Sequence, residues 1–446
     1  MLHFSVVGLL LAAFFTVSCA DSSFQTGESD GGSVIPGTEA GITGPARPTC
    51  SGTSTSIKGV VYAPNGTDPV PGATVFIPAT VPELFPPDVQ CEVCGSLGTS
   101  YNFWTTVTDF DGTFSLDGVC PGEWTLIIQN GRFRRGLVVK VQENTEMTLT
   151  ADQSRLPRKV AEKGPLDSIP RIAVSTGDYD KMECVLHNMG IEEFDILEGA
   201  TYLTSPQKLP PLGGLVQSLE IMKRYNIIFI NCTDNTWEAA LKDEKIRQNI
   251  EAYVTAGGRL YVTDWSYDWI EQLPALAGFV DFEPGVSNES PEAMNAAALG
   301  QEGLQVDAVI KDDTLAKWLG NFPNTVTMKN NEPTVPIGYF LDGWVMMHEL
   351  SAETKVWVEG QVASRRDAPA ISGVRPLTVT FNFKNCGKVL YTSYHTEGRD
   401  EELEAFFNYN TRAKAFPQYC STKLSPQDRV LEFLIYDISK CVKPIG

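Results

Sequence analysis

Two hydrophobic patterns divide the chain. Between residues 56 and 152, short runs of alternating apolar and polar residues are separated by turn sequences such as Pro64-Asn65-Gly66-Thr67 and Asp109-Phe110-Asp111-Gly112. Alternation is typical of strands with one buried face, and many closely spaced short strands predict an all-β sandwich. We expect strands at residues 57–62, 73–77, 101–108, 113–116, 124–128, 137–141 and 146–150.

A different pattern begins at residue 169, after a linker at residues 153–168. Continuous apolar runs now alternate with stretches of helical periodicity. This order predicts an α/β doubly wound parallel sheet over residues 169–446, with an irregular insertion at about 280–385. The expected strands are 171–175, 194–197, 227–232, 259–263 and 387–395, and the expected helices are 180–189, 212–224, 243–256 and 426–440. Within the insertion we expect strands at 306–310, 355–359 and 377–383 and a helix at 313–319.

An acidic and aromatic turn follows the expected strand at residues 259–263. It contains Asp264, Trp265 and Trp269. Ligands of open α/β sheets bind outside the carboxyl ends of the strands, so this turn lies where a site is expected. The two indole rings would stack on a sugar while the carboxylate bonds its hydroxyls, and the alternative is that the rings pack in the core.

The first folded part resembles the carboxypeptidase regulatory-like domains, which implies a transthyretin-like sandwich without catalytic activity of its own. The resembling segments are Gly59-Val60-Val61, Pro71-Gly72-Ala73-Thr74-Val75, Thr108-Asp109-Phe110-Asp111-Gly112-Thr113-Phe114 and Gly118-Val119-Cys120-Pro121-Gly122-Glu123-Trp124-Thr125-Leu126. The basic run Arg132-Phe133-Arg134-Arg135 is interpreted as a solvated strand face, with contact to an anionic glycan or lipid as the alternative.

The second part resembles the class I glutamine amidotransferase-like superfamily, in its flavodoxin-like branch without amidotransferase activity. The resembling segments are Ile172-Ala173-Val174, Tyr225-Asn226-Ile227-Ile228-Phe229-Ile230, Gly257-Gly258-Arg259-Leu260-Tyr261-Val262 and Gly387-Lys388-Val389-Leu390-Tyr391-Thr392-Ser393-Tyr394-His395. The combination of both parts is similar to exported lipoproteins of predatory, social deltaproteobacteria. An active amidotransferase needs a cysteine at the strand-to-helix elbow, where this chain has Asp264, so glutamine hydrolysis is disfavoured.

His395 is the candidate partner of Asp264, because one ends and the other directly follows an expected strand of the parallel sheet. With Asp178 and Glu397 the pair would supply a general base or a metal ligand. The alternative is a hydrogen-bonded loop histidine, which we favour because no nucleophile or second ligand histidine accompanies it. We therefore expect no cofactor and no metal, and interpret Asp178, Asp264, Trp265, Trp269 and His395 as a binding edge.

The amino-terminal sequence indicates export. Residues 1–18 contain an apolar block that ends in small residues, as a signal peptide does. Thr16-Val17-Ser18-Cys19 resembles a bacterial lipobox, which implies lipidation of Cys19; ordinary secretion is the alternative. Residues 19–55, rich in Gly, Ser, Thr and Pro, are predicted to be a flexible tether.

Because the chain is expected to be exported, we expect disulfides. Cys91 and Cys94 form a CxxC pair, and we interpret them as structural disulfide cysteines because no second CxxC or nearby histidine completes a zinc site. Cys232 ends one expected strand and Cys184 lies in the first turns of the first helix, so we expect a bond between them where the two neighbouring βα units bring them together. A nucleophilic Cys232 is the alternative. The full set of disulfide candidates is Cys91, Cys94, Cys184, Cys232, Cys420 and Cys441.

Charge narrows the choice of partners. The formal net charge is -20, which argues against nucleic acid, since binding to phosphates requires an excess of Lys and Arg. The expected function is that of a non-catalytic lipoprotein of the Gram-negative outer membrane or cell surface, with a binding or structural role toward a glycan or another envelope protein. The alternative is an exported hydrolase that uses Asp264 and His395.

Replacing Cys19 with alanine tests the lipid anchor. We expect the Cys19→Ala protein to leave the membrane fraction and to lose metabolic labelling with palmitate, because two or more acyl chains are needed for stable anchoring. The control is Ser22→Ala, in the same tether but outside the lipobox. Unchanged membrane partition of Cys19→Ala would refute lipidation.

Overall fold

The computed structural model describes residues 45–92, 102–199, 209–233, 238–282, 293–338, 340–341, 343–365, 372–396, 416–420 and 423–442. Cys19, Cys94 and Glu397 lie outside these residues. Residues 45–446 cluster into one unit.

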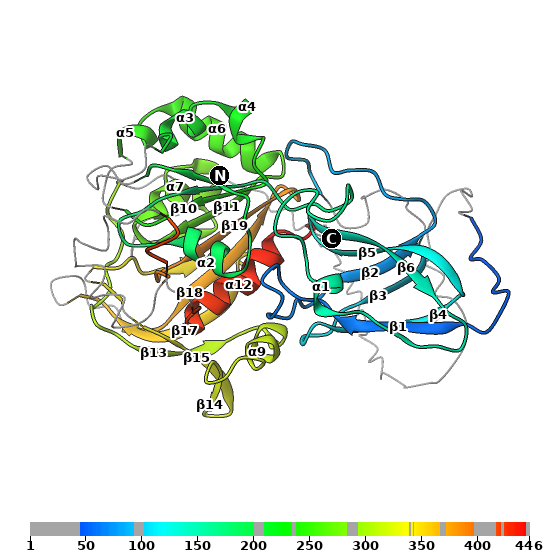
Figure 1. The fold of residues 1–446 in the computed structure, drawn as a ribbon. Helices are drawn as coiled ribbons and strands as arrows, with labels where there is room; N and C mark the ends of the chain where they lie inside the picture. The colour runs from blue at the N-terminus through cyan, green and yellow to red at the C-terminus, as the bar shows by residue number, and fades with distance from the viewer. Residues whose placement is uncertain are drawn as a thin grey trace, which may run out of the picture. The chain divides into compact units, whose positions relative to one another are not determined.

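The first part of the chain forms two β-sheets (Figure 1, blue to cyan). Its described strands are β1 (Thr55–Val60), β2 (Thr74–Pro78), β3 (Asn102–Val107), β4 (Thr113–Val119), β5 (Gly122–Asn130), β6 (Phe133–Val141) and β7 (Met147–Thr148). One sheet has the order β4-β1-β7 and the other β3-β2-β5-β6. Ile57 and Leu116 of the first sheet share a buried core with Val75 and Leu126 of the second. The predicted strands are confirmed, with ends that differ by a few residues. A short helix, α1 (Ala151–Ser154), follows them.

The second part contains a sheet of ten described strands. Its parallel portion consists of β8 (Ile172–Ser175), β9 (Asp195–Leu197), β10 (Ile227–Ile230), β11 (Arg259–Thr263) and β19 (Gly387–Thr392). These strands lie in the order β9-β8-β10-β11-β19, and each neighbouring pair is parallel. The alternation of strands and helices predicted from sequence is confirmed over this portion.

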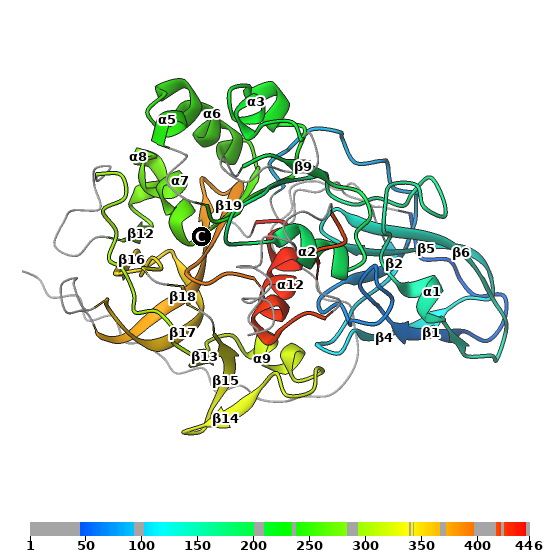
Figure 2. The ribbon, with the colours of Figure 1, turned by 60° about the vertical axis from the view of Figure 1, so that its left-hand side comes forward.

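Helices cover both faces of the parallel strands. On one face are α2 (Met182–Asn188) and α12 (Pro426–Ile438), and on the other are α3 (Leu212–Val216), α4 (Leu219–Met222), α5 (Glu238–Leu241) and α6 (Glu244–Thr255) (Figures 1 and 2). Successive strand residues point to opposite faces. Accordingly, Val174 of β8 joins the core that contains Leu434 of α12, whereas Ala173 joins the core that contains Ile250 of α6. This two-sided burial explains why the strand sequences are continuously apolar.

Residues 280–385 are more regular than their sequence indicates. They contain β12 (Val280–Asp281), β13 (Val306–Ile310), α9 (Asp313–Leu319), β14 (Thr327–Lys329), β15 (Glu332–Ile337), β16 (Glu349–Leu350), β17 (Lys355–Ala363) and β18 (Ser372–Phe383). Except for β12 and β16, which pair with each other, these strands extend the large sheet beyond β19 in the order β18-β17-β13-β15-β14. Each of these neighbouring pairs is antiparallel. The three strands and the helix expected here are confirmed.

The segment between β2 and β3 contacts the α/β part. A disulfide joins Cys91 to Cys386, in the turn before β19. Gly257, at φ 109°, lies so close to this segment that a Cβ would be 2.2 Å from the carbonyl oxygen of Gln90. Only glycine combines this conformation with so close an approach. The disulfide and the backbone contact together hold the segment against the turn that precedes β11.

The basic run on β6 is not a solvated face. Arg132 forms a buried ion pair with Glu92 at 2.7 Å, and Arg135 pairs with Asp167 at 2.5 Å and with Glu162 at 3.1 Å. Arg132 and Arg135 are no more than 5% exposed. Both interpretations made from the sequence are therefore wrong, because the acidic partners come from segments about thirty to forty residues away that the local pattern does not reveal.

The cysteine pairing differs from our expectation. Cys184 on α2 is joined to Cys420, before α12, and not to Cys232, which is buried and free. Cys184 and Cys420 both belong to the side of the sheet that carries α2 and α12, whereas the Cys232 thiol turns toward the end of β11, 3.6 Å from a carboxylate oxygen of Asp264. A further bond joins Cys50 to Cys120, and Cys441 is also disulfide-bonded.

These disulfides indicate that the protein folds in an oxidising environment, as export predicts. Among the described helices, none has the length and apolarity needed to cross a bilayer.

Peptide mapping without reduction tests the pairing. We expect the linked peptides Cys50–Cys120, Cys91–Cys386 and Cys184–Cys420. The thiol of Cys232 should react with iodoacetamide only after unfolding, because it is fully buried. A peptide that links Cys184 to Cys232 would contradict this arrangement.

Candidate functional site

Asp264 forms the elbow at the end of the central strand β11. It begins the 3-10 helix η1 (Asp264–Tyr267), which leads into α7 (Asp268–Glu271) and α8 (Pro274–Ala277). Its φ of 43° lies in the left-handed region, a strain of about 1–3 kcal/mol for a residue other than glycine. The Val345 N–H donates to Oδ1 at 2.6 Å, and the Tyr391 hydroxyl donates to the Asp264 carbonyl at 3.2 Å. These contacts hold a conformation that the chain would otherwise avoid.

His395 follows β19 and faces the Asp264 carboxylate. Its Nε2 lies 2.8 Å from Oδ2 of Asp264, and the two side chains are 7% and 1% exposed. The backbone carbonyl of His395 accepts a 2.7 Å hydrogen bond from Gln427 on α12, and its ring stacks against Tyr179 with centroids 6.3 Å apart. The structure therefore brings together the two residues that the sequence analysis paired, although both are buried.

Cys232 is the third member of the cluster. It comes directly after Asn231 at the end of β10, and its Sγ lies 3.6 Å from Asp264 Oδ2. One ligand atom from each of Cys232, Asp264 and His395 lies within 4.8 Å of the others. Burial, reinforced by the Asp264 charge, raises the pKa of the Cys232 thiol well above its ordinary value. An uncharged thiol is a weak nucleophile, so the alternative of a nucleophilic Cys232 is not supported by this environment.

Further carboxylates surround this cluster. Asp178 accepts a hydrogen bond from the Thr233 hydroxyl, beside Cys232. Asp180, which the sequence analysis missed, accepts from the hydroxyls of Thr263 at 2.8 Å and Thr396 at 2.6 Å. These threonines adjoin Asp264 and His395, so Asp180 ties the ends of β11 and β19 together. Its position directly after the loop of the first parallel strand could have identified it as a residue of the site.

The two tryptophans do not form a sugar-binding edge. Trp269 is 0% exposed and belongs to the core between the sheet and α6. Trp265 is half-buried, and its indole N–H donates to the carbonyl of Gly343 at 2.9 Å. The predicted stacking of both rings on a ligand is wrong, because the helical turn after Asp264 directs the rings into the protein, as the alternative interpretation expected.

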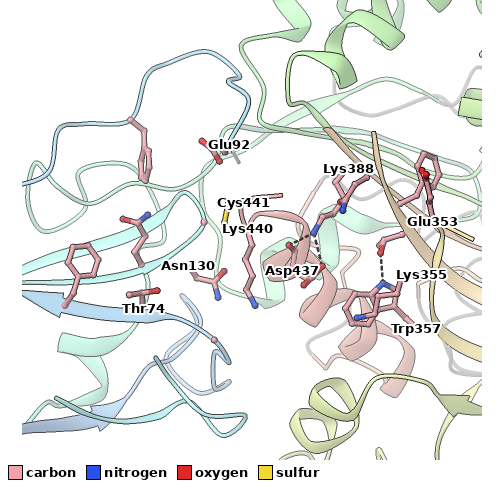
Figure 3. A pocket seen from close by; sticks show the side chains of 18 residues that line it. Thr74, Glu92, Asn130, Glu353, Lys355, Trp357, Lys388, Asp437, Lys440 and Cys441 are labelled. Carbon is pink, nitrogen blue, oxygen red and sulfur yellow. Dashed lines mark hydrogen bonds and ion pairs between the residues drawn. The ribbon is translucent and has the colours of Figure 1, made fainter. Parts of the chain in front are cut away.

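A pocket of about 550 Å³ lies between the sandwich and the large sheet (Figure 3). Thr74 and Asn130 line it from the sandwich, and Trp357 and Lys388 line it from the sheet. In Figure 3 the Lys388 ammonium points toward Asp437 of α12, to which it donates at 3.1 Å. Burial lowers the pKa of Lys388, and the Asp437 charge opposes that shift. Sequence patterns did not predict this pocket, since its walls come from segments about 300 residues apart.

Comparisons with known proteins assign no family. No protein-family model and no curated protein matches the chain. Among solved structures, a cytoplasmic protein from Salmonella typhimurium is 12% identical, covers 62% of this chain and 100% of its own, and has a TM-score of 0.30. PurLQS from Thermotoga maritima is 13% identical, and the match covers 60% of this chain and 98% of PurLQS, with a TM-score of 0.30. An exo-β-1,4-mannosidase from Opitutaceae bacterium strain TAV5 is 11% identical, and the match covers 50% of this chain and 31% of the mannosidase, with a TM-score of 0.24. Similarities this weak establish neither fold nor function.

Glu183 gives the site region a pH-dependent stability. It is buried on α2, where it accepts hydrogen bonds from Tyr419 and Asn231. Burial raises its pKa to about 7, and the nearby Asp180 adds to the rise while Lys181 opposes it. The native state therefore holds a proton that the unfolded state releases near pH 4.5. Protonated Glu183 therefore contributes to the free energy of unfolding at low pH. As the pH rises from about 4.5 to about 7, the free energy of unfolding decreases by up to about 3 kcal/mol.

The Glu183→Gln variant should lack this pH-dependent loss, because an amide does not titrate. We expect urea unfolding at about pH 5 and about pH 8 to differ less in this variant than in the wild type. Glu123→Gln, on the exposed side of β5, is the control and should keep the wild-type difference. Equal pH dependence of Glu183→Gln and the wild type would contradict the raised pKa.

Proposed function

We propose that the chain is an exported, non-catalytic envelope protein that binds a hydroxyl-rich ligand, a carbohydrate, between its sandwich and its α/β part. The observation that carries this proposal is the pocket of about 550 Å³, a volume typical of small-ligand sites. Its walls come from both parts of the chain, and pockets at such junctions are frequent ligand sites.

The chemistry of the pocket suits sugar hydroxyls, which both donate and accept hydrogen bonds. Asn130 and Gln129 offer amides, Asp437 offers a carboxylate and Lys388 an ammonium. Aromatic side chains complete the lining, and they favour the apolar faces of sugar rings. These side chains are Phe76, Phe85, Trp357 and Phe381.

The elbow of β11 supports a role other than amidotransfer. An amidotransferase uses a cysteine thiolate at this position, and here Asp264 occupies it. Cys232 lies on the neighbouring strand, and burial keeps its thiol protonated. A hydrolytic function built on a thiolate is therefore disfavoured on chemical grounds.

The finer fold assignments are part of the proposal. The parallel strands in chain order give the arrangement 2-1-3-4-5, which is the order of flavodoxin-like sheets. This order supports a resemblance of the α/β part to the class I glutamine amidotransferase-like superfamily. Two facing sheets of three and four described strands support a transthyretin-like, carboxypeptidase regulatory-like sandwich.

Lipidation at Cys19 and display on the outer membrane or cell surface complete the proposal. The oxidising environment indicated by the disulfides is compatible with this location. Such a protein would hold the pocket away from the membrane on the tether predicted at residues 19–55, where glycans of the envelope are within reach.

A second candidate function is an exported hydrolase centred on Asp264 and His395. The observation that favours it is the 2.8 Å separation of their side chains at the carboxyl edge of the sheet. Backbone strain at Asp264 agrees with this reading, because strained residues cluster at functional sites. The pair would act as a general base on a water molecule.

Glycan-array binding by the full exported chain tests the proposal, followed by titration of any bound sugar with the Lys355→Ala variant. Lys355 lines the pocket and pairs with Asp312 at 2.7 Å. We expect about tenfold weaker binding, the cost of one hydrogen bond to a charged group. Lys329→Ala is the matched control, since Lys329 is equally exposed and pairs with Asp307 away from the pocket.

Two outcomes would contradict the proposal: no sugar binds, or Lys355→Ala and Lys329→Ala bind equally well. Mass spectrometry of the bound sugar distinguishes the two candidate functions. An intact sugar supports binding, whereas cleavage by the wild type that is lost in Asp264→Asn supports the hydrolase. Asparagine keeps the shape of the side chain and tolerates the left-handed conformation of the elbow.

A further inference from the structure

We propose that Cys232, Asp264 and His395 form a binding site for a divalent transition-metal cation of the zinc class. They follow β10, β11 and β19, three neighbouring parallel strands, so their side chains converge at one edge of the sheet. Each contributes one ligand atom, and these atoms lie within 4.8 Å of one another. This proposal replaces our expectation from the sequence that the chain holds no metal, and it does not rest on the sugar pocket.

One separation matches that around a tetrahedral cation, and a second is shorter by an amount that a side-chain movement can supply. With metal–ligand distances of about 2.3 Å for sulfur and about 2.1 Å for nitrogen and oxygen, tetrahedral ligands are about 3.4–3.6 Å apart. Cys232 Sγ and Asp264 Oδ2 are 3.6 Å apart, within that range. His395 Nε2 and Oδ2 are 2.8 Å apart and need to separate by about 0.6 Å, a small side-chain movement.

The ligand types select the cation. A thiolate, an imidazole and a carboxylate suit zinc and similar transition metals, whereas Mg²⁺ and Ca²⁺ prefer oxygen ligands only. Binding breaks the Sγ–H bond of Cys232, forms a metal–sulfur bond and releases the proton to solvent. The cation would lie against the buried Asp264 carboxylate and balance its charge.

An independent observation is that Cys232 stays reduced. Every other cysteine among the described residues is disulfide-bonded, whereas Cys232 is free and buried. Cys232 forms no disulfide and is not suited to act as a nucleophile, so metal coordination is the role that its position supports.

Surrounding contacts hold the ligands in place. Oδ1 of Asp264 accepts from the Val345 N–H at 2.6 Å, which directs Oδ2 toward His395 and Cys232. Gln427 holds the backbone of His395 at 2.7 Å. Hydrogen bonds of this kind orient metal ligands and raise affinity. Three protein ligands leave one position of a tetrahedral cation for a further ligand, the coordination number found in catalytic zinc sites.

Metal analysis of the full exported chain tests the site. We expect about one zinc per chain by mass spectrometry after purification without chelators, and one Co²⁺ per chain after chelator treatment and reloading. Tetrahedral Co²⁺ with a thiolate ligand should show a sulfur-to-cobalt charge-transfer band in the near ultraviolet. Cys232→Ser should abolish that band, and His395→Gln should weaken Co²⁺ binding at least tenfold.

His348→Gln is the matched control. His348 also faces a carboxylate, with Nδ1 at 3.1 Å from Oδ2 of Asp281. It does not belong to the cluster of Cys232, Asp264 and His395. This variant should bind Co²⁺ as the wild type does. Circular dichroism establishes that each variant is folded, and the charge-transfer band of the wild type tests the thiolate ligand without any substitution.

Three outcomes would overturn the site. The first is no stoichiometric Zn²⁺ or Co²⁺ in the wild type, and the second is bound Co²⁺ without a thiolate band. The third is equal binding in the His395→Gln and His348→Gln variants, which would identify surface coordination. None of these measurements depends on a bound sugar, so the site and the proposed pocket fail or succeed separately.

Discussion

The arrangement of the α/β part depends on the hydrogen bonds of the Arg259 guanidinium. Arg259 is buried, with 4% of its surface exposed. It lies at the start of β11 and donates to backbone carbonyls of Ile438 at 2.8 Å, Cys386 at 2.7 Å and Lys440 at 3.2 Å, and also to that of Gly257. One side chain thus joins the end of α12, the turn before β19 and the turn before β11. A buried cation must be fully hydrogen-bonded, so these segments are held together at the amino end of the sheet.

Fixing α12 at this end has a consequence at the opposite end of the sheet. The same helix carries Gln427 near its start, and Gln427 holds the backbone of His395. Strand β11 itself ends at Asp264, whose carboxylate faces His395. The two ends of β11 therefore have different roles. At the amino end, the Arg259 guanidinium binds backbone carbonyls and positions α12, and at the carboxyl end the strained Asp264 lies beside the polar side chains that follow β10 and β19.

Much of the secondary structure could be predicted because it depends on local patterns. The apolar runs of β8, β10 and β11 are buried on both faces, and the alternating strands of the sandwich are buried on one. The place of Asp264 at the strand end followed from the rule that parallel strands present their carboxyl ends at one edge. The same rule made His395 its candidate partner, although a hydrogen-bonded loop histidine was the favoured interpretation. Side-chain direction after the strand was not predictable: the turn at Asp264 sends Trp269 into the core.

The sequence by itself determined the sandwich strands, the parallel strands of the α/β part and the absence of a cysteine at the elbow, because these depend on periodicity and residue identity. Only the tertiary structure decided which distant groups meet. It paired Cys184 with Cys420, gave Arg132 and Arg135 buried acidic partners, and placed the Cys232 thiol beside Asp264. Contacts between residues far apart in the chain depend on how whole elements pack, and no local pattern of hydrophobic and polar residues encodes them.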